Sequence, residues 1–149
     1  MTELQKLFEE EQAIQQSVRK ISEGVLELSD YSLAKSVIEL AEAEVVGKNI
    51  RKACDEISEH VHKARKVLGA LLTSASTVKL KNKERPLHEV ENELALIHGD
   101  LESIGSIAEK FFEAKDRKIA FQNLNQHYSE LMQHLTSLLL EEAALKPRN

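Results

Sequence analysis

The sequence contains few of the residues that interrupt helices and few that form disulfides or large aromatic cores. Its 149 residues include five glycines, two prolines, one cysteine and no tryptophan, and aromatic side chains make up 4% of the chain. One cysteine cannot form an internal disulfide, so a small secreted fold held together by disulfides is not indicated. Glycine and proline are the residues that most often form turns, so their scarcity favours long, uninterrupted secondary-structure elements.

Long apolar runs are also missing. No stretch approaches the roughly 20 apolar residues that a transmembrane helix needs. The first residues, MTELQKLFEEEQ, contain three consecutive glutamates and lack the basic start and apolar stretch of a signal peptide. We therefore expect a soluble protein of a reducing compartment, the cytoplasm, with the nucleus as the alternative.

The abundant residues indicate an all-α fold. Leu, Ala, Glu, Lys, Gln and Ser dominate, and charged residues make up 30% of the chain. Most of these residues favour helices, whereas strand formers are scarce. A chain of this length can bury a continuous apolar core without a metal or a disulfide. We therefore expect residues 1–149 to form a single helical-bundle domain.

Apolar residues recur at intervals of three and four, which places them on one face of a helix. Glu11 is the one polar exception within the first such stretch. Pro86 marks the start of the third helix, because proline lacks an amide donor and is favoured in a first turn. The pattern predicts helices over residues of about 3–28, 31–76, 86–114 and 115–145.

Two features leave the helix boundaries open. Gly47 lies inside the second predicted helix, where glycine costs about 1 kcal/mol relative to alanine, so a kink there is as well supported as continuity. The apolar period also shifts by one residue across the polar run EAKDRK, residues 113–118. That run contains no glycine, no proline and no strong cap, which favours one continuous or kinked helix over two separate helices.

The expected fold is an antiparallel bundle of three to four long helices with coiled-coil character. Predicted segments of similar length suit a closed up-down bundle. The alternative is an elongated assembly of three helices, in which the excess length of a long hairpin pairs with another chain. Both architectures are all-α.

Charged side chains are segregated along the chain. Residues 1–47 carry four basic and ten acidic side chains, residues 48–86 carry ten and four, and residues 87–149 carry six and eleven. The middle third is therefore basic in a chain whose net charge is −5. Either this segment packs against acidic neighbours inside the bundle, or it binds an acidic protein or the phosphates of a nucleic acid or an anionic membrane surface.

The binding interpretation names seven candidate residues. They are Lys63, Arg65, Lys66, Lys79, Lys81, Lys83 and Arg85. The last four lie in the segment TSASTVKLKNKER, which has no clear apolar period. We interpret this segment first as a connection between helices and second as a contact surface.

Motifs that support catalysis or metal binding are weak. Glu59 and His62 form a Glu-x-x-His pair, whose spacing places both side chains on one helix face and recurs in di-iron bundles. Such centres need a second pair, and the sequence has none. Gly-rich phosphate loops, Cys/His metal spacings and Ser/His/Asp arrangements are absent too. We expect no catalytic residue, no metal site and no cofactor.

Two further positions have specific expectations. Cys54 shares an apolar pattern with Ile50 and Ile57, which predicts a small buried hydrophobic residue rather than a reactive thiol. Phe111 and Phe112 are adjacent, about 100° apart on a helix, so they cannot both face one narrow apolar surface. We expect one of the two phenylalanines to lie in a protein interface.

These observations predict a non-enzymatic helical interaction or scaffold protein, either an oligomer or a subunit of a larger complex. Partner helices would be recognised through apolar helix faces, and blocks of charge would select the partner and its orientation. The main alternative is a phosphate-binding module that uses residues 48–86. A bundle enzyme that uses Glu59 and His62 is the third hypothesis. No small-molecule substrate is evident.

Overall fold

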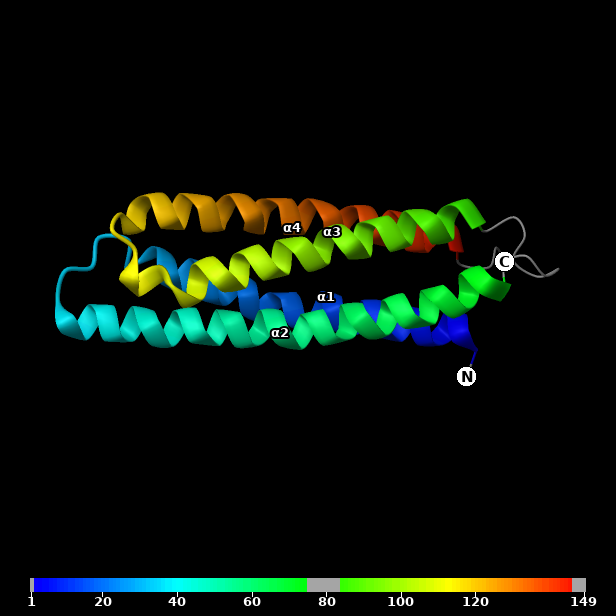
Figure 1. Ribbon diagram of the computed structural model, residues 1–149, viewed down its shortest axis with the longest axis horizontal. Coiled ribbons are helices and arrows are strands. Elements are labelled where there is room, and N and C mark those ends of the chain that lie inside the picture. Colours follow the sequence, from blue (N-terminus) through cyan, green and yellow to red (C-terminus); the bar gives the residue numbers. More distant parts are fainter. Residues whose placement is uncertain (1, 75–83, 146–149) are drawn as a thin grey trace.

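The structure is a computed structural model that describes residues 2–74 and 84–145. Most of these residues belong to four α-helices: α1 (Glu3–Ser29), α2 (Val37–Ser74), α3 (Glu84–Glu109) and α4 (Arg117–Leu145). A short 3₁₀ helix, η2 (Phe111–Glu113), lies between α3 and α4, and no strand occurs in the two described ranges. The predicted all-α helical bundle is confirmed (Figure 1).

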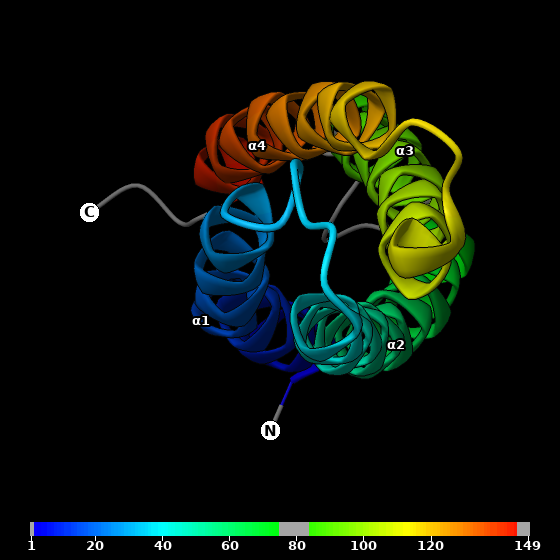
Figure 2. The ribbon, with the colours of Figure 1, turned by 90° about the vertical axis from the view of Figure 1, so that its left-hand side faces the viewer.

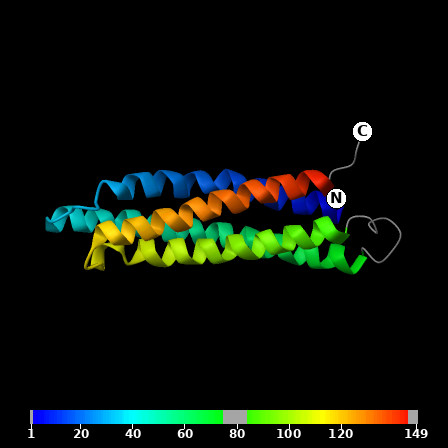
Figure 3. The same ribbon diagram turned by 90° about the horizontal axis from the view of Figure 1, so that it is seen from above.

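The helices alternate in direction along one long axis and follow one another around the bundle in chain order (Figure 2). Helix α2 packs against α1 and α3, and α3 packs against α4, whereas α1 and α4 make fewer contacts with each other. The α1–α2 and α3–α4 connections lie at one end, and α1 begins and α4 ends at the opposite end (Figure 3). Of the two predicted architectures, the structure is the up-down bundle.

Helix α1 shows why the apolar spacing predicted the core. It begins with a capping box, in which the Thr2 hydroxyl accepts from the amide of Gln5 at 3.1 Å and the Gln5 side chain accepts from the amide of Thr2 at 2.9 Å. Glu11 is buried together with the apolar positions. Those positions are Leu7, Ile14, Val18, Ile21, Val25 and Leu28.

Buried side chains from all four helices join these α1 residues in one apolar cluster. Two polar contacts also span the side where α1 faces α4. The Gln15 side chain donates to the backbone carbonyl of Leu135 at 3.4 Å, and the hydroxyls of Ser22 and Tyr128 lie 2.5 Å apart. No helix in the described part of the chain combines the length and apolar character needed to cross a bilayer.

Helix α2 begins later than predicted, at Val37 rather than near residue 31. The chain first makes a turn after α1, with the amide of Tyr31 bonded to the carbonyl of Leu28 at 3.0 Å. Ser36 is the residue that caps α2, because its hydroxyl accepts from the amide of Glu39 at 3.1 Å. The predicted start at residue 31 was wrong because an earlier serine and aspartate offered equally plausible caps.

Gly47 does not interrupt α2, which runs as one helix from Val37 to Ser74. A methyl group at position 47 would lie 2.1 Å from the carbonyl oxygen of Ala108 on α3. The glycine therefore does not bend α2. It allows the backbones of α2 and α3 to approach each other closely. Gly24 and Gly105 also face close neighbours, the side chains of Ile50 and Arg51, whereas Gly69 and Gly99 have nothing within 4 Å.

The prediction that favoured one continuous helix across residues 113–118 was wrong. Helix α3 ends at Glu109, η2 follows, and Ala114 adopts an extended conformation with φ −63° and ψ 137°. Helix α4 then begins at Arg117, and the carboxylate of Asp116 accepts from the amide of Ile119 at 3.1 Å. Asp116 therefore caps α4, although the polar run in which it lies showed no strong cap in the sequence.

Candidate interaction surface

The first turns of α2 project beyond the other helices at the end of the bundle that holds the α1–α2 connection (Figure 1, Figure 3). Large apolar side chains are exposed at this end of the bundle, in the last turn of α1, in the α1–α2 connection and in the first turn of α2. Leu33 and Val37 are 75% and 83% exposed, and Leu26 and Ile38 are 74% and 72% exposed. Several such side chains close together on a surface indicate an interaction site more strongly than single ones do.

The apolar surface continues along α2. Ile38, Ala41 and Val45 are spaced by three and four residues, so they share one helix face, and all three are exposed. Ala43 and Val46 lie on the opposite face and are buried in the core. Helix α2 is therefore apolar on two faces over these turns, and only one of them is covered by the bundle.

The charge around this apolar surface is acidic. Residues 26–45 contain five acidic side chains and one basic side chain. The carboxylate of Glu42 accepts from the hydroxyl of Tyr31 at 3.0 Å and raises the pKa of that phenol. The α1–α2 side of the end therefore combines exposed aliphatic groups with negative charge. We call residues 26–45 the acidic lobe.

The α3–α4 side of the same end has the opposite charge. Residues 110–118 contain four basic and two acidic side chains, and Ile119 beside them is 53% exposed. We call residues 110–119 the basic lobe. The guanidinium of Arg117 donates to the backbone carbonyl of Ala34, which joins the two lobes. The α1–α2 connection crosses the middle of the bundle end toward α4, so the two lobes adjoin there (Figure 2).

The predicted basic residues that the structure describes lie away from this end. The Arg65 guanidinium donates to Glu91 on α3 at 2.8 Å, and Arg85 donates to Glu89 at 3.1 Å. Lys63 is exposed beside His98 in a surface groove. Lys66 lines the same groove, whereas three further candidates lie outside the described residues: Lys79, Lys81 and Lys83.

The Glu-x-x-His pair lines the same groove. Glu59 and His62 are on α2, and the groove lies between α2 and α3, with a volume of about 630 Å³. Its other lining residues include Asp55, Ser58 and Glu102, so charges of both signs surround it. The groove does not bring a second Glu-x-x-His pair to Glu59 and His62.

The two adjacent phenylalanines differ in burial. Phe111 is fully buried and belongs to the apolar cluster of the bundle. Phe112 is half-buried and packs against that cluster. They lie in η2, within the basic lobe, so Phe112 is the one of the two that still reaches the surface. Its place in an interface remains a prediction.

Cys54 is buried, 2% exposed, in the core of α2. Burial, followed by the nearby Asp55 carboxylate, raises the pKa of its thiol to about 12. The thiolate is the reactive form of cysteine, so both burial and the raised pKa suppress reaction.

We expect native protein at pH 8 to react with a thiol reagent at least about a hundredfold more slowly than urea-unfolded protein. A chromogenic disulfide reagent followed by absorbance measures both rates, and the unfolded protein is the control for reagent access. Equal rates would contradict the buried placement of Cys54.

In comparisons with known proteins, no family model, no curated protein and no solved structure matches the chain.

Proposed function

We propose that the chain is a non-enzymatic helical interaction protein that associates end to end with a second copy of itself. The observation that carries this proposal is the exposed apolar surface of the acidic lobe beside the basic lobe. The apolar side chains supply area to bury, and the two lobes supply complementary charge. The protein would act as a scaffold that presents its helix faces in a fixed arrangement.

A two-fold axis makes one surface complementary to itself. When two bundles meet end to end about such an axis, the acidic lobe of each copy can face the basic lobe of the other. The projecting turns of α2 in one copy would then lie against η2 and the start of α4 in its partner. Opposite charges would select this orientation and oppose a parallel one.

The apolar groups are sufficient for a weak dimer. Complete burial of one large aliphatic side chain contributes about 1.5–3 kcal/mol, and association costs about 4–15 kcal/mol. Leu26, Leu33, Val37 and Ile38 occur twice in a dimer, and a projecting end buries them only in part. We therefore expect a Kd on the order of 10 µM.

Light scattering coupled to size-exclusion chromatography tests the proposal. The molar mass should rise from 16.8 kDa toward twice that value as the concentration passes through about 10 µM. Ile38→Glu places a charge in the apolar contact and should raise Kd about tenfold or more. Lys118→Glu should also weaken the dimer, and added salt should weaken the wild type, because both reduce the attraction between the lobes.

Leu140→Glu is the matched control. Leu140 is 70% exposed on α4, but it lies toward the opposite end of the bundle. Its variant should dimerise like the wild type. A wild-type protein that stays monomeric up to tenfold above about 10 µM would overturn self-association. A dimer that Leu140→Glu disrupts and Ile38→Glu does not would place the interface elsewhere.

The phosphate-binding alternative is less well supported by the described residues. Arg65 and Arg85 are each hydrogen-bonded to a glutamate of α3, which reduces the charge that they offer to a phosphate. Among the residues that the structure describes, no contact favours phosphate binding over end-to-end association.

A further inference from the structure

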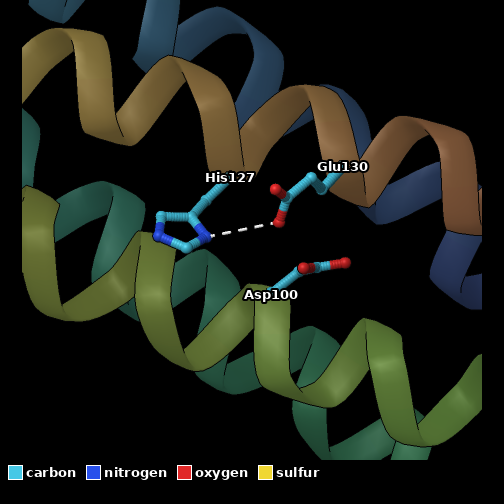
Figure 4. A group of neighbouring side chains, drawn as sticks. All are labelled: Asp100, His127 and Glu130. Atoms are coloured by element: carbon cyan, nitrogen blue, oxygen red, sulfur yellow. Dashed lines mark ion pairs between the residues drawn. The ribbon is translucent and has the colours of Figure 1, made fainter.

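One group of side chains between α3 and α4 brings together atoms that could bind a metal ion. Asp100 lies on α3, and His127 and Glu130 lie on α4 and point toward it (Figure 4). One potential ligand atom from each of the three lies within 4.8 Å of the others. His127 Nδ1 and Glu130 Oε2 are 3.6 Å apart. It is the only such group among the residues that the structure describes.

Asp100 is an unusual residue for its position. It is 6% exposed, and Nδ1 of His134 lies 2.5 Å from its Oδ2. A buried carboxylate is costly unless positive charge or hydrogen bonds compensate it. His134 supplies part of that compensation, and a cation held between α3 and α4 would supply more.

We propose that Asp100, His127 and Glu130 form a binding site for one divalent transition-metal ion of the zinc class. Imidazole nitrogen and carboxylate oxygen together suit zinc and its neighbours in the first row better than they suit calcium, which takes oxygen ligands only. From the sequence we expected no metal site, because the spacing of His127 and Glu130 on α4 does not reveal Asp100 on α3.

The three candidate ligand atoms lie within 4.8 Å of one another, so the side chains would move closer together to bind zinc. Tetrahedral ligands at 2.0–2.1 Å from zinc lie about 3.3 Å from one another. The 3.6 Å between His127 Nδ1 and Glu130 Oε2 is already close to that value. Both side chains are half-buried, so they can rotate toward a metal without disturbing the core.

His134 has a separate, positioning role. Its Nδ1 lies 2.5 Å from Oδ2 of Asp100, so an N–H there donates to the carboxylate. Residues that hydrogen-bond a metal ligand fix its orientation, and their loss commonly weakens metal binding by about 10–100-fold. His127, Glu130 and His134 are spaced by three and four residues on one face of α4, which is why all three meet Asp100.

A metal at this site would join α3 to α4 near the middle of both helices. Three protein ligands leave a fourth position for water, since His127 and Glu130 keep partial contact with solvent. The metal would hold the two helices in register. This role does not depend on end-to-end association, because all ligands belong to one chain.

Isothermal titration of EDTA-treated protein with zinc chloride tests the site. We expect one zinc ion per chain, and saturating zinc should raise Tm by roughly 5–10 °C. Asp100→Asn, His127→Ala and Glu130→Gln should each weaken zinc binding at least about tenfold. Because His127 and Glu130 are half-buried, their variants are expected to fold normally, which circular dichroism checks.

Three control variants make the result specific. His62→Ala removes a histidine of the Glu-x-x-His pair and should leave zinc binding unchanged. Ile38→Glu should also bind zinc like the wild type, which separates this site from the proposed dimer. His134→Gln, which retains a donor, should weaken binding less than His134→Ala does.

Failure of the wild-type chain to bind zinc would overturn the proposal. Binding that survives both His127→Ala and Glu130→Gln would overturn it as well, since the ion would then be held by other residues.

Discussion

Replacing Gly47 with alanine is expected to lower the free energy of unfolding by about 2–3 kcal/mol, although alanine is the better helix former by about 1 kcal/mol. The added methyl group would lie 2.1 Å from the carbonyl oxygen and 3.0 Å from the carbonyl carbon of Ala108. These are backbone atoms, so no side-chain rotation can relieve the overlap. Helices α2 and α3 would have to separate, and the core side chains between them would lose packing contacts with one another.

Gly99→Ala is the matched control, because a methyl group there meets nothing within 4 Å. This variant should raise the free energy of unfolding by about 0.4–1 kcal/mol, through the lower entropy of the unfolded chain. Urea unfolding followed by far-ultraviolet circular dichroism measures both variants. If Gly47→Ala were as stable as Gly99→Ala, α2 and α3 would not approach each other as closely as the structure shows.

The fold was predictable from sequence where burial alone decides the pattern. Helix α1 was predicted over 3–28 and found over Glu3–Ser29, because each buried position repeats at intervals of three and four. Helix ends were harder. Asp30, Ser32 and Ser36 all had suitable side chains for a cap, and in the structure Ser36 caps α2 through its local contacts with Glu39.

The turn between α3 and α4 was missed for a related reason. The period of apolar residues shifts by one position there, and such a shift is compatible with either a turn or a helix that changes its buried face. Asp116 was read as one charge among several in a polar run, although it caps α4. A cap is recognisable only once the position of the first helical turn is known.

The candidate surfaces were less predictable than the fold. Leu33 lies within the predicted second helix, residues 31–76, but the late start of α2 leaves it outside that helix and 75% exposed. The spacing of His127, Glu130 and His134 is visible in the sequence. Their approach to Asp100 is not, since it depends on how α3 and α4 align after an unpredicted turn.

Replacing Phe111 with alanine is expected to lower the free energy of unfolding by about 3–5 kcal/mol, the largest effect that we predict for a single substitution. Phe111 is fully buried, and it packs in the core from η2, where the chain reverses between α3 and α4. Its loss would leave a cavity between helices whose backbones are held in place by the rest of the core. Urea unfolding measures the change.

Phe112→Ala is the comparison that makes this result specific to burial, because it removes the same atoms from the next residue. Phe112 is half-buried, so its truncation should cost only about 1–2 kcal/mol. The two losses differ because truncation of the buried Phe111 leaves a cavity that water does not fill. The Phe112 ring is already partly covered by water, so its truncation removes fewer protein contacts. If both variants lost the same free energy of unfolding, Phe111 and Phe112 would be buried to a similar extent, contrary to the structure.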